Sequence, residues 1–290
     1  MSYSINDTEW LLLLRRIKDG KCTPFLGAGA CYGVLPLACE IAKDWSMEHK
    51  SPMTDCDDLA RVAQFLAVKF DPMFPKEELL KKFQGMPPPD FRTPDEPHGI
   101  LADLPLPVYM TTNYDDYMVQ ALNDRNRDPK REFCRWNTYI KDEPSVFGTG
   151  FRPTVANPVV FHLHGHDEVS ESLVLTEDDY LTFLVNISRD QNIIPPRILE
   201  AFTGSSLLFI GYSLADWDFR VLFQGLVNAT DPNLRRISVT VQLPPTQKEL
   251  QEYQEKYFGE MSKGMRVYWG TAKEFVAELK ERWDEFMKQG

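Results

Sequence analysis

The sequence lacks the patterns that mark membrane and secreted proteins. No stretch approaches the roughly 18 consecutive apolar residues of a membrane-spanning helix, and the apolar run at residues 10–14 ends at Arg15. The first ten residues show no basic segment followed by an apolar core, which a secretory signal requires. We therefore expect no membrane association and a cytoplasmic location.

Cysteine pairs are also missing. The five cysteines, Cys22, Cys31, Cys39, Cys56 and Cys134, include no C-x-x-C spacing, so a tetrahedral zinc module of that kind is not expected. An odd number of cysteines without a secretory signal favours a reducing compartment.

Positive charge is scarce as well. The chain has 32 basic and 43 acidic residues, a net charge of −11, which argues against direct binding of nucleic acid. Its 290 residues suit one large α/β domain carrying an insertion.

Short apolar runs alternate with helical patterns along the chain, which predicts a parallel sheet with helices on both faces. The fold expected is a Rossmann-like, doubly wound α/β domain over residues 1–290, with a helical insertion at about 38–100 and a C-terminal helix at about 272–288.

Residues 125–156 are rich in charge, Gly and Pro, which predicts a long loop or cover. Pro24 should begin its strand, because proline cannot donate to a central ladder. Strands are expected within residues 22–30, where the strand opens into a Gly-rich turn, and within 106–113, 157–165, 205–213, 235–243 and 265–270.

Ligands of such folds bind at the carboxyl ends of the strands. After the first apolar run come Gly27, Ala28 and Gly29, small residues that let the backbone approach a pyrophosphate. The G-x-G-x-x-G fingerprint fails, because Tyr32 stands at its third glycine. A simple tight turn is the alternative.

Polar residues follow the second strand. Thr112, Asn113, Asp115 and Asp116 offer a hydroxyl, an amide and two carboxylates at one strand mouth. An asparagine side chain can both donate to and accept from ribose hydroxyls. One of the two aspartates is expected only to cap the next helix.

The third strand ends in three histidines, which alternate with Phe161 and Leu163. If the strand continued, His162, His164 and His166 would share one face. We expect no metal there, since no further ligand motif accompanies them. His164 precedes Gly165 and should turn into the cleft as a base, with His162 buried and His166 solvated.

The fourth strand end carries Gly211, which permits close backbone approach, and Ser213, which supplies a hydroxyl. Asp216 or Asp218 follows and can cap a helix or hold a ribose.

Six segments in this order resemble the sirtuin superfamily, and especially the sirtuin-like domains of prokaryotic antiphage defence proteins. They are GAGA with GVLP, PHGILADLP, TTNYD, HLHG, LTEDDYLTF and LLFIGYSLADWDFR. The resemblance implies that Gly27, Ala28 and Gly29 cradle the NAD phosphates and that Thr112, Asp115, Gly211, Ser213 and Asp216 help to bind NAD. It also implies that Asn113 lies near the nicotinamide ribose and that His164 is the catalytic histidine.

Two departures matter. Cys31 stands where the family usually has serine after GAGA, and the four zinc cysteines of the deacetylase sirtuins are absent. The helical insertion occupies the place of the zinc domain, so the groove for an acyl-lysine substrate is not expected. Water is then favoured over an acetyl oxygen as the group that accepts the ADP-ribosyl moiety.

The function expected is therefore an NAD hydrolase that forms nicotinamide and ADP-ribose, as an effector of antiphage defence. A non-catalytic NAD or ADP-ribose sensor and an NAD-dependent protein deacylase are the alternatives. By family analogy, control is expected from homo-oligomer assembly or from a partner such as a HerA-like ATPase or an Argonaute-like protein. Residues Phe275, Leu279, Trp283 and Phe286 of the last helix should cover its own core, with a subunit contact as the alternative.

Overall fold

One parallel sheet organises the molecule. A computed structural model describes residues 5–213, 236–261 and 265–289. Within them, seven strands follow the order β3-β4-β2-β1-β5-β6-β7, and each neighbouring pair is parallel. The expected α/β class is confirmed. The strands are β1 (Cys22–Leu26), β2 (Val108–Thr111), β3 (Lys130–Phe133), β4 (Val159–His162), β5 (Ser206–Ile210), β6 (Ser238–Gln242) and β7 (Met265–Trp269).

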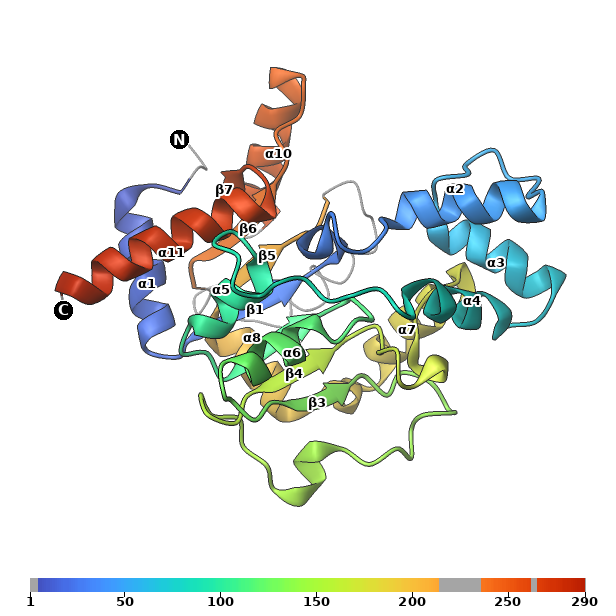
Figure 1. Ribbon diagram of the computed structural model, residues 1–290, viewed down its shortest axis with the longest axis horizontal. Coiled ribbons are helices and arrows are strands. Elements are labelled where there is room, and N and C mark those ends of the chain that lie inside the picture. Colours follow the sequence, from blue (N-terminus) through green and yellow to red (C-terminus); the bar gives the residue numbers. More distant parts are fainter. Residues whose placement is uncertain (1–4, 214–235, 262–264, 290) are drawn as a thin grey trace.

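Helices cover both faces of this sheet (Figure 1). Helices α1, α5, α6 and α11 share one apolar core with the sheet, and α7 and α8 share the other. Among the described residues the helices are α1 (Asp7–Lys18), α2 (Ala38–His49), α3 (Leu59–Lys69), α4 (Phe74–Phe83), α5 (Pro97–Asp103), α6 (Tyr117–Asp124), α7 (Glu177–Arg189), α8 (Pro196–Gly204), α10 (Lys248–Met261) and α11 (Ala272–Gln289).

The last helix covers the core, as expected. Phe275, Leu279 and Trp283 of α11 are buried, and Phe286 packs against the same core with part of its surface exposed. No helix in the described part of the chain combines the length and apolar character needed to cross a membrane.

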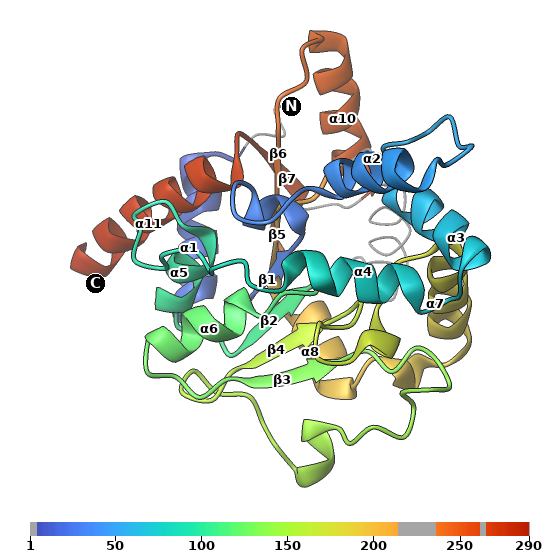
Figure 2. The same ribbon diagram turned by 45° about the vertical axis from the view of Figure 1, so that its right-hand side comes forward.

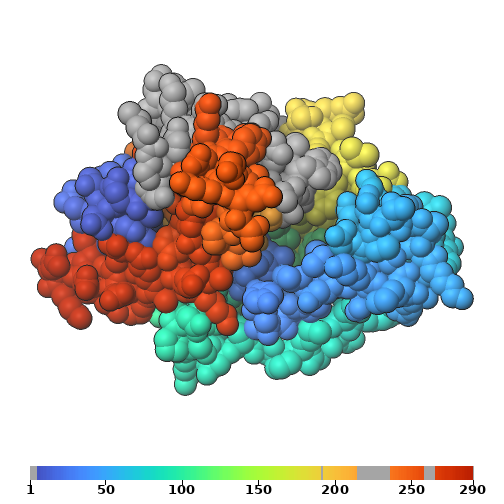
Figure 3. Space-filling model, turned by 90° about the horizontal axis from the view of Figure 1, so that it is seen from above, coloured from blue at the N-terminus to red at the C-terminus, as the bar shows by residue number. Residues whose placement is uncertain are grey.

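The helical insertion has a small core of its own. Trp45 of α2, Leu66 of α3 and Leu79 of α4 are buried together, and Leu175, just before α7, joins them. The three helices lie beyond the carboxyl ends of the central strands (Figures 1 and 2) and form one flank of the molecule, opposite α11 (Figure 3). The insertion was expected to end at about residue 100, which would include the first turn of α5. Helix α5 packs instead against α6 in the main body, so the insertion ends before it.

Strand β3 was not predicted. It lies inside residues 125–156, which read as a loop, and pairs in parallel with β4 at the sheet edge. Its sequence, KREF, is mostly charged and only half-buried, so it lacks the apolar run that marks the other strands.

Pro24 lies in the middle of β1, not at its start. Lys21 O accepts from Ser206 N of β5. The backbone N–H and C=O groups of successive residues in a strand point to opposite neighbouring strands. Lys21 points to β5, so Pro24, three residues later, points to β2. The β1–β2 register begins only at Phe25, so the missing N–H falls at the start of that ladder.

Candidate active site

A cleft with a volume of about 640 Å³ opens at the carboxyl ends of β1, β2, β4 and β5, a size usual for small-molecule sites. The insertion forms its opposite wall, through residues of α2, α3 and α4. Residues 125–156, which read as a cover, supply none of the described lining. From the strand ends the lining residues are Ala28, Cys31, Thr112, Asn113, Tyr114, Asp115, His164, Gly211 and Tyr212.

The turns after β1 and β5 cross in direct contact. Gly211 has a φ of 84°, and a Cβ atom there would lie 2.3 Å from Ala30 N. Gly27 N donates to Ile210 O and Gly29 N donates to Gly211 O, each at 2.9 Å. These two N–H groups therefore hold the crossing together. Ala28 and Cys31 are the residues of this turn that line the cleft.

Asn113 is fixed by the first turn. Its Nδ2 donates to Gly27 O at 3.1 Å and to Cys31 Sγ at 3.3 Å, while its backbone N–H donates to Thr111 Oγ1. The residue is half-buried and lines the cleft.

Thr112 belongs to a hydroxyl chain. Tyr212 Oη donates to Leu26 O at 2.7 Å and lies 2.9 Å from Thr112 Oγ1. Since the phenol has one proton, Thr112 is the donor in that second bond. The chain ties the mouths of β1, β2 and β5 together.

Asp115 is the capping aspartate. Its Oδ1 accepts from Tyr117 N at 3.0 Å, and its Oδ2 accepts from the Cys31 thiol at 3.3 Å. Asp116, at the N-cap position of α6, makes no capping bond. Burial raises the pKa of Asp116 to about 7 against the lowering effect of Arg131. Arg131 Nε lies 3.1 Å from Asp116 Oδ1, out of line for a hydrogen bond.

His164 lines the cleft, and aromatic side chains pack against its ring. Its ring packs edge-on against Tyr180 at 5.4 Å and Phe183 at 5.1 Å between centroids. Burial lowers its pKa to about 3, not near 6.5 as the sequence suggested, so the imidazole is neutral at pH 7.

The other two histidines do not share a face with His164, because β4 ends at His162. His162 is buried, as expected, with Nδ1 3.2 Å from Asn113 O. His166 was expected in solvent but is only 6% exposed. Its ring packs edge-on against Phe133 of the unpredicted strand β3 and lies beside His162, and its backbone N–H donates to Ser172 Oγ.

Two predicted binding residues are not placed in the cleft. Ser213 is exposed and is not among the described lining residues, and Asp216 lies outside the described residues. Gly27 and Gly29 support the site through the crossing described above.

Sequence reasoning missed two features. Arg61 of α3 lines the cleft, with Nε 3.3 Å from Glu177 Oε1 and a second ion pair to Asp55. Behind Cys31 lie His98 and Glu96, which are buried. The segment PHGILADLP was noticed as a motif, but its histidine carried no signal of a site.

Curated relatives match part of the chain. Proteins named NAD(+) hydrolase ThsA are 30% identical over 128 residues in Cytobacillus dafuensis, 25% over 162 residues in Acinetobacter baumannii and 26% over 145 residues in Bacillus cereus. These matches cover 44%, 56% and 49% of this chain but only 23%, 27% and 26% of the relatives. The chain thus corresponds to about a quarter of their length.

Among solved structures, a chain from work described as "Structural Basis for the Mechanism and Regulation of Sir2 Enzymes" is 11% identical, with a TM-score of 0.46. That match covers 98% of this chain and all of the other.

The SIR2-like domain family matches residues 107–261, which is more than half of the chain and contains Asn113, His164 and Gly211. This chain therefore belongs to the family of SIR2-like domains.

Proposed function

We propose that this chain is an NAD hydrolase, which cleaves NAD to nicotinamide and ADP-ribose. One observation carries the proposal: Asn113 and His164, which arise from different strands, line one cleft of a SIR2-like domain. Relatives with the name NAD(+) hydrolase support the choice of substrate.

The binding roles follow from the strand mouths. Thr112, Asp115 and Gly211 line the cleft beside Asn113, and Ala28 brings the first turn to it. In this proposal the crossing of Gly27 and Gly29 with Gly211 shapes the floor for the dinucleotide. Ser213 and Asp216 are proposed to complete the nucleotide site from the segment after β5.

Cleavage of NAD needs no strong general acid, because nicotinamide is already a cationic leaving group. The bond from ribose to nicotinamide breaks with its electron pair passing to the cationic ring, which leaves neutral, and water adds to the ribosyl cation. One proton from water is released. Asn113 keeps Nδ2 bonded to Gly27 and Cys31, so its Oδ1 is the atom proposed to accept from a ribose hydroxyl or from water.

His164 acts as a neutral acceptor in this scheme. With a pKa of about 3, it accepts a hydrogen bond from the ribose or from water without carrying positive charge beside the ribosyl cation. Turnover should then stay level from pH 8 to pH 5. A fall centred near pH 6.5 would indicate that His164 titrates as an ordinary histidine.

The deciding experiment follows nicotinamide release from NAD by purified wild type, Asn113→Ala and His164→Ala. Matched controls are Asn157→Ala, an exposed asparagine outside the cleft, and His49→Ala, on α2 and not among the described lining residues. We expect release by wild type and both controls, with losses of about 10² to 10⁴ in the two cleft variants, the range for a positioned polar or acid–base group. Equal release by His164→Ala would refute its role.

A sensor without turnover is the second candidate. The low pKa of His164 favours it, because a weak base suits binding better than proton transfer. Calorimetric binding of NAD without any nicotinamide release on prolonged incubation would identify a sensor.

We further propose that the enzyme serves antiphage defence by depleting NAD, under the control of homo-oligomer assembly or of a HerA-like ATPase or Argonaute-like partner. The test is cellular NAD during phage infection, with and without the partner, for wild type and Asn113→Ala. NAD that stays constant in infected wild-type cells would contradict the defence role.

A further inference from the structure

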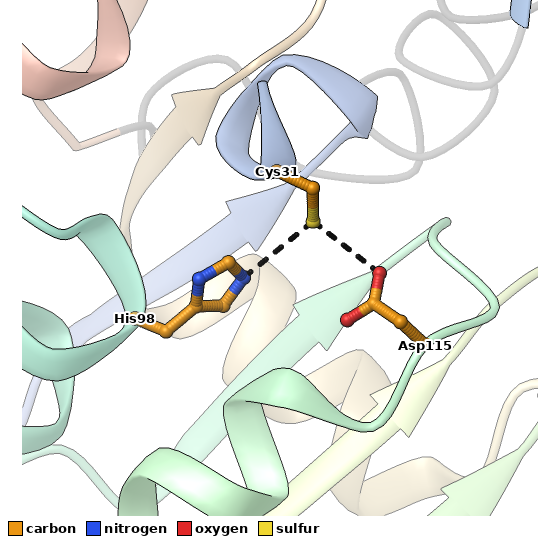
Figure 4. A group of neighbouring side chains, drawn as sticks. All are labelled: Cys31, His98 and Asp115. Carbon is orange, nitrogen blue, oxygen red and sulfur yellow. Dashed lines mark hydrogen bonds between the residues drawn. The ribbon is translucent and has the colours of Figure 1, made fainter. Parts of the chain in front are cut away.

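Three side chains from separate elements meet beside the cleft (Figure 4). Cys31 ends the 3-10 turn η1 (Ala28–Cys31), His98 lies on α5, and Asp115 follows β2. Cys31 Sγ is 3.9 Å from His98 Nε2 and 3.3 Å from Asp115 Oδ2. All three ligand-type atoms lie within 4.8 Å of one another.

We propose that Cys31, His98 and Asp115 form a binding site for a divalent transition metal, with Zn²⁺ as the ion that suits them best. Thiolate, imidazole and carboxylate are the three ligand types that zinc uses in proteins. Tetrahedral bonds of the usual lengths set a sulfur ligand roughly 3.5 Å from a nitrogen or oxygen ligand. The observed sulfur–nitrogen and sulfur–oxygen separations, 3.9 Å and 3.3 Å, lie on either side of that value. Cys31 and Asp115 line the cleft, so the proposed site borders it.

The histidine is already oriented for metal binding. His98 Nδ1 lies 2.7 Å from Glu96 Oε1, and since a carboxylate can only accept, Nδ1 is the donor. The other oxygen of Glu96 accepts from Gly99 N at 2.5 Å, which fixes the carboxylate at the start of α5. A carboxylate on the far nitrogen is the usual support of a zinc-bound histidine.

The Cys31 thiol donates its one proton toward Asp115 Oδ2 across 3.3 Å. A metal ion replaces that proton: sulfur binds the ion as thiolate, the proton passes to solvent, and nothing is oxidised or reduced.

This site departs from the expectation of no metal. No metal was expected because the three histidines near β4 lack a further ligand motif and the cysteines show no C-x-x-C spacing. Cys31, His98 and Asp115 are instead far apart in the sequence, and only the fold brings them together. Cys31 also accepts from Asn113 Nδ2, so a bound ion would draw that acceptor toward itself. We therefore expect Zn²⁺ to slow nicotinamide release, a consequence that rests on the proposed function, whereas the site does not.

The test measures metal binding in the absence of NAD, so its failure is separate from failure of the proposed function. The metal-stripped full chain is titrated with Zn²⁺ against a chromophoric chelator, and with Co²⁺ to follow the near-ultraviolet thiolate absorption. The variants are Cys31→Ser, His98→Gln and Glu96→Gln. The matched control is Cys56→Ser, whose thiol faces Met53 O outside the cluster.

We expect one equivalent bound by wild type and by Cys56→Ser, with the thiolate band present. Cys31→Ser should lose the band, and Cys31→Ser and His98→Gln should bind Zn²⁺ at least about tenfold more weakly, while Glu96→Gln should lose about 10- to 100-fold. Absence of a thiolate band in wild type would overturn the proposal, as would Cys31→Ser binding as tightly as wild type. The wild-type band decides the matter even if a buried variant does not fold.

Discussion

The side-chain amide of Asn113 donates to the sulfur of Cys31 across 3.3 Å. This bond couples the residue proposed to orient the ribose to the turn after β1. Because Asp115 accepts from the same sulfur, Cys31 links the mouths of β1 and β2. Cys31 is therefore a positioning residue for Asn113.

Cys31→Ala should loosen Asn113, because one of the two acceptors of its Nδ2 is removed. A hydrogen bond of this kind contributes about 0.5–1.5 kcal/mol, which corresponds to roughly a two- to tenfold loss of kcat/KM for NAD. Cys31→Ser keeps an acceptor and should lose less. Steady-state kinetics on both variants, with Cys56→Ala as the control, make the comparison. A larger loss in Cys31→Ser than in Cys31→Ala would contradict the positioning role.

Arg61 should assist the binding of NAD. It is the basic side chain among the described lining residues, and it is held by Glu177 at the wall of the cleft. Arg61→Ala should raise KM about three- to tenfold with kcat unchanged, since an exposed charge contributes uniform binding. Glu177→Gln removes one of the two ion pairs of Arg61 and leaves the pair with Asp55, so it should make the guanidinium more available to the diphosphate and lower KM.

The salt dependence of KM distinguishes a charge contact of Arg61 with NAD from a structural effect of the substitution. An exposed charge acts less at high ionic strength, so the KM difference between wild type and Arg61→Ala should shrink as salt is added. Arg197→Ala, whose side chain pairs with Glu200 on α8, is the control. A KM difference that is independent of salt would argue against a charge contact.

Acidification should destabilise the fold through two histidines. Burial lowers the pKa values of His162 and His164 to about 3, against an ordinary value of 6.5. Between these values the unfolded chain binds more protons, so the free energy of unfolding falls as pH drops below 6.5, by about 1.4 kcal/mol per pH unit for each histidine. Urea unfolding at pH 7, 6 and 5 measures the slope. A level stability over that range would contradict the burial of neutral histidines.

Asp116 should oppose that loss. Its pKa is raised from 3.8 to about 7, so the folded chain binds the extra proton as pH falls from 7 toward 4 and gains stability. Asp116→Asn removes this gain, and its unfolding free energy should fall more steeply than that of wild type, by roughly 1 kcal/mol per pH unit. Asp128→Asn, at an exposed position, is the control. Parallel slopes in wild type and Asp116→Asn would show that Asp116 stays ionised.

The parts of the fold that sequence predicted are those with strong local signals. Strands β1, β2, β4, β5, β6 and β7 are apolar runs, and the helices around them have helical spacing. Strand β3 has no such signal, because three of its four residues are charged and two are only partly buried. The same omission hid one contact of the buried His166, its edge-on packing against Phe133 of β3.

The site was predictable where it depends on strand ends. Asn113 and His164 follow strands directly, and strand ends of a parallel sheet converge. Arg61 of α3 lines the cleft, while Glu96 and His98 at the start of α5 lie buried behind Cys31. No local pattern fixes how these helices pack, so the positions of these side chains needed the fold. The pKa of His164 likewise depends on Tyr180 and Phe183, which arrive from α7.

The glycine at the crossing of the two turns should tolerate no side chain. Gly211 has a φ of 84°, and an added Cβ would lie 2.3 Å from Ala30 N and 2.6 Å from Gly27 O, both backbone atoms. Gly211→Ala should therefore cost at least about 2 kcal/mol of unfolding free energy, from left-handed strain and overpacking together. The control is Gly148→Ala, where an added Cβ meets nothing within 4 Å. Urea unfolding of both variants measures the difference. Equal stability of Gly211→Ala and Gly148→Ala would mean that the turns after β1 and β5 can separate. The crossing would then not hold Ala28 and Asn113 in place.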